Sequence, residues 1–191
     1  MKPLLKGVAR GVAALAVLPS LASYWLRARL FGADRAFEGS CQALSLVPGV
    51  AGQYLRSAFL CRVLAECHDS VTVEHGVLFS TVGARLGRRV YLGPRCHLGL
   101  VDIGDDALLA AGVHVPSGGH IHGVDGDRPI REQPLQRSVV RIGSGAWIGS
   151  AAVVMADVGD ETIVGAGAVV TRPLPARVVA AGVPARVVRP R

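Results

Sequence analysis

The sequence predicts an all-β fold, a parallel β-helix of hexapeptide repeats with an N-terminal helical extension. Three observations point to this fold. From about Val73 onward an aliphatic residue recurs every six positions, often followed by glycine, with a small or β-branched residue in the fifth place. Aromatic residues make up only 5% of the 191 residues, although 50% are hydrophobic. An apolar stretch with helical spacing precedes the repeats.

The six-residue pattern has a simple geometric interpretation. Residues 86–91 (LGRRVY) and 92–97 (LGPRCH) are two successive hexads. Each hexad supplies one short strand and one corner, so three hexads complete a triangular coil. The first-place aliphatic residue fills the interior, and the fifth place must be small because the prism is narrow. Glycine in the second place relieves a corner that a Cβ would crowd.

The repeat is interrupted in four places. Residues 98–102 are one residue shorter than a hexad, residues 154–157 are two residues shorter, and residues 79–85 are one residue longer. The largest interruption is an extruded loop at residues 121–141, which begins directly after His120. A loop of that length inside a compact repeat is usually functional. We therefore divide the chain into an N-terminal helical segment (1–70) and a β-helix domain (71–191) that carries this loop.

The N-terminal segment is apolar and basic. Residues 11–26 carry no charge, but they are fewer than the roughly 20 residues that a spanning helix needs. Basic residues before this stretch and Ser20-Leu21-Ala22 within it also resemble a signal peptide. Trp25 beside Arg27 favours a helix lying in the headgroup region, so we expect membrane-surface contact through residues 1–31. A membrane-spanning anchor, a signal peptide and a core helix remain as alternative interpretations of this segment. Residues 49–66 are expected to form a helix that caps the repeats.

Charge and cysteine content exclude several classes of function. The net charge of +7 fits either an ordinary basic surface or an anionic partner, and the basic residues gather near both termini. Nucleic acid is disfavoured because no basic strand with interleaved aromatic residues occurs. The four cysteines have irregular spacing and no C-x-x-C pair, which indicates free thiols rather than a disulfide framework or a zinc site.

Three local motifs carry a resemblance to a known family. They are Gly119-His120 at the loop entry, Trp147-Ile148-Gly149-Ser150, and the tail at 164–171 (VGAGAVVT) and 180–188 (AAGVPARVV). Together they resemble the hexapeptide-repeat acyltransferases, especially the galactoside and maltose O-acetyltransferase branch, over about residues 71–189. Residues 118–132 also resemble acyltransferases of surface polysaccharide biosynthesis.

The resemblance implies a left-handed β-helix that forms a homotrimer, with active sites in the grooves between neighbouring prisms. Acetyl-CoA or another acyl-CoA is the implied co-substrate, with no metal and no tightly bound cofactor. His120 is the implied catalytic residue. A hydroxyl is too weakly acidic to attack a thioester unaided, so a base near neutral pH must take its proton. His122, two residues on, is the alternative base.

The resemblance also assigns roles around the acyl group. Trp147 would line the acyl or acceptor pocket, and the Ser150 backbone N–H would donate to the thioester oxyanion. A structural role stays open for Trp147, and Arg186 and Arg189 remain open to the alternative that they belong to an ordinary charged tail. The residues implied to bind the coenzyme, from the pantetheine arm to the phosphates, are Gly149, Ser150, Ala166, Thr171, Arg172, Arg186 and Arg189.

The implied reaction is O-acetylation of a saccharide hydroxyl, in the biosynthesis of a surface polysaccharide or a glycolipid. The acceptor would be a saccharide or lipid-linked glycan, reached in the cytoplasm or at the inner face of the plasma membrane. Residues 92–95 (LGPR) replace the polar acceptor set of the galactoside and maltose branch, so simple galactosides and maltose are doubtful acceptors. The catalytic Asp-His-Ala segment of serine acetyltransferases is absent.

Two further functions remain as alternatives. His97 and His114 end hexads one coil apart and should stack, and γ-class carbonic anhydrases bind zinc through histidines on this fold. That class also needs two histidines five positions apart, which this sequence lacks. A zinc-dependent lyase is therefore a weak alternative. A non-catalytic β-helix scaffold is the other.

Overall fold

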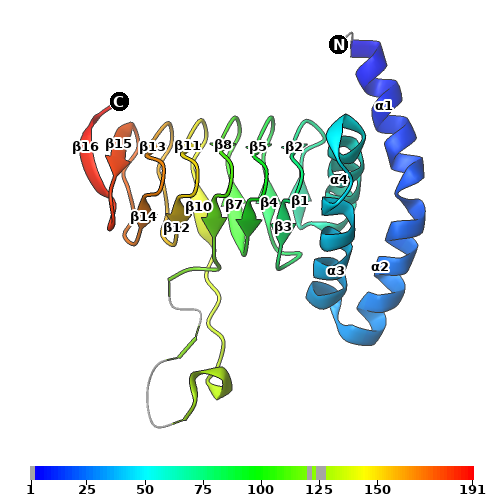
Figure 1. The fold of residues 1–191 in the computed structure, drawn as a ribbon, viewed down its shortest axis with the longest axis horizontal. Helices are drawn as coiled ribbons and strands as arrows, with labels where there is room; N and C mark the ends of the chain where they lie inside the picture. Colours follow the sequence, from blue (N-terminus) through cyan, green and yellow to red (C-terminus); the bar gives the residue numbers. More distant parts are fainter. Residues whose placement is uncertain (1–2, 120–121, 124–127) are drawn as a thin grey trace.

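The computed structural model describes residues 3–119, 122–123 and 128–191. Four helices at one end are followed by a parallel β-helix, from which one long loop extends (Figure 1). The predicted parallel β-helix with an N-terminal helical extension is thereby confirmed.

The β-helix has three sheets, which we name A, B and C in the order in which the chain visits them. All neighbouring strands pair in parallel except the last two of sheet B. Sheet A contains β1 (Glu66–Cys67), β4 (Arg85–Leu86), β7 (Val101–Ile103) and β10 (Val140–Ile142). Sheet B contains β2 (Thr72–Val73), β5 (Tyr91–Leu92), β8 (Leu108–Leu109), β11 (Trp147–Ile148), β13 (Ile163–Val164), β15 (Val178–Ala181) and β16 (Arg186–Pro190). Sheet C contains β3 (Leu78–Phe79), β6 (His97–Leu98), β9 (His114–Val115), β12 (Val153–Val154) and β14 (Val169–Val170).

The interior follows the predicted hexad pattern. The first-place side chains are fully buried, and small residues occupy the fifth place, so the aliphatic side chains of successive coils stack inside the prism. Sixth-place residues precede each buried position and point outward. The buried first-place residues include Leu86, Leu92, Leu98, Leu109, Ile142, Ile148, Val164 and Val170, and the buried fifth-place residues include Val90, Cys96, Ala107, Val113, Ala146, Ala152 and Ala168.

The corners differ in one respect from the expectation. A Cβ on second-place Gly149 would lie 2.5 Å from the Ala166 nitrogen, so the crowding comes from the next coil rather than from the corner itself. The left-handed backbone conformation falls instead on the fourth place of each hexad. Arg89, Asp106 and Ala151 adopt it there, with φ between 54° and 60°.

The helical segment comprises α1 (Pro3–Ala16), α2 (Leu18–Phe31), α3 (Ala33–Ser45) and α4 (Gly49–Val63). Helices α3 and α4 cover the first coil, as Figure 1 shows. Phe37 and Phe59 stack with ring centroids 6.2 Å apart, and Phe37 also contacts Phe79 of β3. The predicted capping helix is therefore present, and it seals the end of the aliphatic interior with aromatic rings.

Helices α1 and α2 form the outermost layer of this end (Figure 1). A stripe of large apolar side chains on them faces solvent, including Leu5, Val8, Val12, Leu15, Leu18, Trp25, Leu26 and Leu30. Within the described residues no single helix has both the length and the apolarity to cross a bilayer. The segments Leu5–Ala16 and Leu18–Phe31 together pass that test, but they are bent by 43°.

The long loop leaves the prism after β9 and returns at β10, at the corner between sheets C and A (Figure 1). It contains one short 3-10 turn, η1 (Ile130–Glu132). Val140 and Arg141, which the hexad phase placed in the loop, pair instead with Val101 and Asp102 of β7. The ordered repeat thus resumes two residues earlier than the sequence interpretation had it.

Candidate functional site

One corner of the prism, between sheets B and C, brings together four of the predicted site residues. Trp147 projects outward from β11, and its side chain is half exposed. Buried Gly149 and exposed Ser150 form the turn that follows, and Ala166 occupies the same place one coil later. Gly149 must lack a side chain here because the backbone of the next coil lies against it. The glycine therefore allows the coil that carries Ala166 to pack directly on the Ser150 turn.

The backbone N–H of Ser150 differs from those of equivalent turns between sheets A and B. There the third-place N–H is capped by an aspartate of the next coil: the Ser144 N–H donates to Asp160 Oδ1 at 2.7 Å. The residue sixteen positions after Ser150 is Ala166, which has no acceptor in its side chain. Among the described residues nothing accepts from the Ser150 N–H, so this donor is available to a ligand.

The predicted coenzyme-binding residues fall at two corners. Arg186 lies opposite Ala181 in the antiparallel pair of β15 and β16, and Ala181 packs on Gly165 beside Ala166. Among the described residues its guanidinium donates only to the adjacent Ala185 carbonyl, and that of Arg189 donates to the Pro190 carbonyl. Both guanidinium groups are exposed, and the coenzyme-binding roles of Arg186 and Arg189 stay predictions. Thr171 and Arg172 are also exposed, but they lie at the next corner, after β14.

His120, the predicted base, lies outside the described residues. The neck of its loop is held by the Ser138 N–H, which donates to the Ser117 carbonyl at 3.0 Å. Gly119 approaches Met155, since a Cβ there would lie 3.9 Å from the Met155 Cβ. His122, the alternative base, forms an isolated antiparallel bridge with Leu135 across the loop. The loop neck and the Ser150 turn therefore lie at different corners of the same prism.

The two histidines of sheet C stack as the hexad phase predicts. The His97 and His114 ring centroids are 5.1 Å apart, and the planes differ by 15°. Partial burial, together with the neighbouring His97, lowers the pKa of His114. No third ligand accompanies them: among residues 3–119, 122–123 and 128–191 no group of three His, Cys, Asp or Glu side chains is placed to hold a metal ion.

Sequence reasoning missed two features of the site. Tyr91, Leu108 and Trp147 occupy the sixth place of their hexads, and their strands pair in register, so they form one outward column on sheet B. The second feature is the contrast between the capped and the uncapped turns. Both signals are present in the sequence, in the sixth place of the hexads and in the sixteen-residue spacing that relates Ser144 to Asp160 and Ser150 to Ala166.

Comparisons with known proteins agree with this architecture. No family model matches the chain. The galactoside O-acetyltransferase of Escherichia coli K12 is 35% identical to it over 144 residues, which cover 70% of this chain and 68% of that protein.

Two solved structures share the fold. A galactoside acetyltransferase in complex with coenzyme A is 28% identical, covers 82% of this chain and 80% of its own, and superposes with a TM-score of 0.64. A maltose O-acetyltransferase from Clostridium difficile 630 is 22% identical, covers 82% and 87%, and reaches a TM-score of 0.70. The chain folds as a β-helix of hexapeptide repeats and is 35% identical to the E. coli enzyme over two thirds of both chains. It therefore belongs to the galactoside O-acetyltransferase branch of the hexapeptide-repeat acetyltransferases.

Proposed function

We propose that this protein transfers the acetyl group of acetyl-CoA to a hydroxyl of a saccharide in the biosynthesis of a surface polysaccharide or glycolipid. The observation that carries the proposal is the uncapped Ser150 N–H in the turn that follows the strand of exposed Trp147. A donor held by a rigid turn, without a protein acceptor, suits an oxyanion that forms only during the reaction.

The chemistry needs a general base and an oxyanion donor from the protein. His120 accepts the proton of the acceptor hydroxyl while the hydroxyl oxygen attacks the thioester carbonyl. The tetrahedral intermediate places its negative charge on the former carbonyl oxygen, which accepts a hydrogen bond from the Ser150 N–H. The C–S bond then breaks, the ester is released, and the proton held by His120 passes to the coenzyme A thiolate. No metal and no covalent enzyme intermediate enters this sequence.

The position of the loop supports a site shared between subunits. The neck at Ser117 and Ser138 lies at the corner between sheets C and A, whereas Ser150 lies at the corner between sheets B and C. Sheet C separates the two corners within one chain. A homotrimer with prisms side by side places the loop of one subunit against the Ser150 corner of its neighbour, so we propose that assembly.

The coenzyme is proposed to lie along the corner between sheets B and C. Gly149 and Ala166 offer a surface without long side chains for the pantetheine arm, and the exposed forks of Arg186 and Arg189 suit phosphate oxygens. Arg172 and Thr171 lie one corner away, and in the proposed trimer they would face the same groove from the adjoining prism.

We also propose that the enzyme works at the inner face of the plasma membrane. The stripe from Leu5 to Leu30 on α1 and α2 leaves large aliphatic side chains and Trp25 in solvent, which is costly for a helix surrounded by water. A helix pair with such a stripe, interrupted by few charges, suits the boundary between headgroups and acyl chains. A lipid-linked glycan would be acetylated there.

The experiment is a measurement of acetyl-CoA consumption with a panel of saccharides and glycolipids, using wild type, His120→Ala and His122→Ala. We expect turnover with at least one saccharide, loss of that turnover in His120→Ala, and retention of most of it in His122→Ala. Equal turnover in wild type and His120→Ala contradicts the assigned base. Absence of turnover with every saccharide, together with turnover of another acceptor class, contradicts the assigned substrate.

A further inference from the structure

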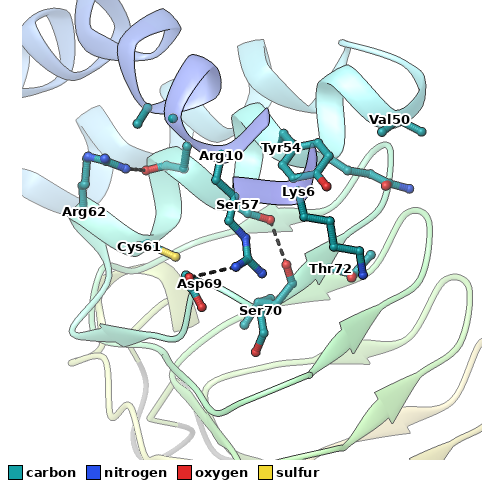
Figure 2. Close-up of a pocket in the computed structure, with 15 residues that line it drawn as sticks. Lys6, Arg10, Val50, Tyr54, Ser57, Cys61, Arg62, Asp69, Ser70 and Thr72 are labelled. Carbon is teal, nitrogen blue, oxygen red and sulfur yellow. Dashed lines mark hydrogen bonds and ion pairs between the residues drawn. The ribbon is translucent and has the colours of Figure 1, made fainter. Parts of the chain in front are cut away.

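A second candidate site lies at the opposite end of the β-helix from the coenzyme tail. Helices α1 and α4 and the first coil enclose a cavity of about 630 Å³, which Figure 2 shows. This volume is in the range of small-molecule sites. Lys6 and Arg10 of α1 reach into it toward Ser70 and Thr72, and Tyr54 and Ser57 line it from α4 (Figure 2).

The charge of the cavity is unbalanced. Its lining holds the cations Lys6, Arg10 and Arg62 and a single carboxylate, Asp69, which Arg10 binds at 3.1 Å. Lys6 has no carboxylate partner among the described residues. Such a cavity attracts an anion, because its excess of positive charge favours charge-assisted hydrogen bonds to an oxyanion.

The orientation of α1 is unusual for a surface helix. Lys6 and Arg10, one turn apart, face the cavity, whereas Leu5, Val8, Val12 and Leu15 on the other side of the helix are 56–70% exposed. In a helix that is merely solvated, cations point to water and aliphatic side chains point inward. Here Ala13 and Val17 are buried as expected, but the four larger aliphatic side chains face solvent, and the two cations, although exposed, line the cavity and are accessible to a ligand there.

The polar groups between the cations suit a sugar. Tyr54, Ser57 and Thr72 line the same space. Ser70 and Gln53 also line it, although the Ser70 hydroxyl already accepts from the Arg89 N–H at 2.8 Å and the Gln53 amide donates to Glu74 at 2.8 Å. The Ser57 hydroxyl donates to the Val71 carbonyl at 3.0 Å and keeps its oxygen lone pairs for a ligand. Donors and acceptors of this kind pair with the hydroxyls of a saccharide, and the cations pair with a phosphate attached to it.

The cavity lies on the same outward column as Trp147. Thr72 pairs in register with Tyr91, Tyr91 with Leu108, and Leu108 with Trp147. Three strand spacings separate Thr72 from Trp147, which is about 14 Å. A group bound at Lys6 is therefore remote from the acetylated hydroxyl, and it acts as an anchor rather than as a reacting group.

We propose that this cavity binds a phosphate ester of a saccharide, and that the acceptor of the acetyl group is held by its phosphate at Lys6 and Arg10. The inference rests on the proposed function for its acceptor role, but not for the binding itself. The phosphate belongs either to a soluble sugar phosphate or to a lipid whose chains lie against the apolar stripe of α1.

Calorimetric titration of the full-length protein with glucose 1-phosphate, and with glucose as the neutral control, tests the binding. Vesicles of phosphatidylcholine with and without phosphatidylglycerol test the lipid source by co-sedimentation. The test variant is Lys6→Gln. The matched control is Arg35→Gln, which removes the same charge from an exposed position on α3 outside the cavity.

We expect one of the two phosphate probes to bind, and Lys6→Gln to weaken that binding about tenfold while Arg35→Gln leaves it unchanged. Binding of glucose 1-phosphate assigns the soluble source, and binding confined to the phosphatidylglycerol vesicles assigns the lipid source. Binding of neither probe, or equal binding by wild type and Lys6→Gln, overturns the proposal. Acetyl transfer to a neutral saccharide in that event leaves the proposed function standing, so the two failures are distinguishable.

Discussion

The imidazole rings of His97 and His114 lie face to face on sheet C, with centroids 5.1 Å apart. Because protonation of His114 is disfavoured by partial burial and by His97, its pKa is lower in the folded protein than in the unfolded chain. The unfolded state therefore binds more protons near pH 6, and stability must fall as the pH drops below the unfolded value of about 6.5. Above that value both states carry a neutral ring, and the contribution is constant.

We predict that His114→Gln flattens this part of the stability profile. Melting temperatures measured from pH 7 to pH 5 should fall less in the variant than in wild type. His75→Gln, at an exposed position away from the pair, is the control and should follow wild type. An unchanged slope in His114→Gln would show that the stacked pair does not contribute to the pH dependence.

Capping the Ser150 turn should slow transfer strongly without unfolding the protein. In Ala166→Asn the side-chain oxygen occupies the place that Asp160 Oδ1 takes beneath Ser144, and it accepts from the Ser150 N–H without adding charge. Since loss of one oxyanion donor costs about 10²- to 10³-fold in kcat, we expect a decrease of that size. Asp160→Ala uncaps the Ser144 turn instead, and should lower the melting temperature but keep kcat. Full activity of Ala166→Asn would refute the role of this donor.

The close approach of successive coils predicts a large penalty at Gly149. An alanine Cβ would lie 2.5 Å from the Ala166 nitrogen and 2.8 Å from the Val164 oxygen, both backbone atoms that cannot rotate away. We expect Gly149→Ala to lose about 1–3 kcal/mol of unfolding free energy or more. Gly11→Ala is the control, because a Cβ at this helical position meets no atom within 4 Å and should be neutral or stabilising. Urea denaturation measures both.

The cysteines should differ in reactivity. The Cys61 and Cys67 sulfurs lie 3.2 Å apart, and the hydrogen bond from Cys67 lowers the pKa of the Cys61 thiol. Burial raises the pKa of Cys41 to about 12 and that of Cys96 to about 11. Because the thiolate is the nucleophile, iodoacetamide at pH 8 should label Cys61 first and leave Cys41 and Cys96 unlabelled. Peptide mass spectrometry gives the order, and early labelling of Cys96 would contradict it.

The apolar stripe of α1 predicts binding to lipid. Glutamate in place of exposed Val8 and Val12 puts two charges where acyl chains are proposed to lie, and should abolish co-sedimentation with vesicles. The same two charges added at Ala176 and Val183, exposed residues near the C-terminus, are the control. If both double variants sediment with vesicles as wild type does, α1 is not the membrane contact.

The six-residue pattern predicted the prism because each first-place residue has one geometric option, the interior. Leu86, Leu92 and Leu98 are buried on three successive sides, as their spacing demands. The stacking of His97 on His114 followed from the same phase. Capping of a turn by the next coil was harder, since it depends on the side-chain chemistry of residues sixteen positions apart and not only on the hexad phase. The capping of Ser144 by Asp160 is one such pair.

The helical segment that caps the β-helix was the least predictable part of the fold. Arg56 is a charged residue on an apolar helix, so its sequence context suggests that it faces solvent. It is instead buried and donates to the Val73 and Val47 carbonyls. The Val47 carbonyl lies in the link just before α4, but the Val73 carbonyl belongs to β2, which only the tertiary fold brings to α4. The cavity beside α1 was not predicted, because its lining comes from α1, α4 and the first coil, which only the tertiary fold brings together.

Strand β16 turns back antiparallel on β15, where every earlier strand of sheet B follows its neighbour in parallel. Helices α3 and α4 cover the first coil, so an open parallel edge at the other end would offer its amide groups to the same edge of another molecule. The reversed strand, carrying arginine at both Arg186 and Arg189, covers that edge and adds repelling charge. Removal of residues 182–191 would therefore leave an edge at which two molecules pair end to end, a hazard unrelated to any loss of coenzyme affinity.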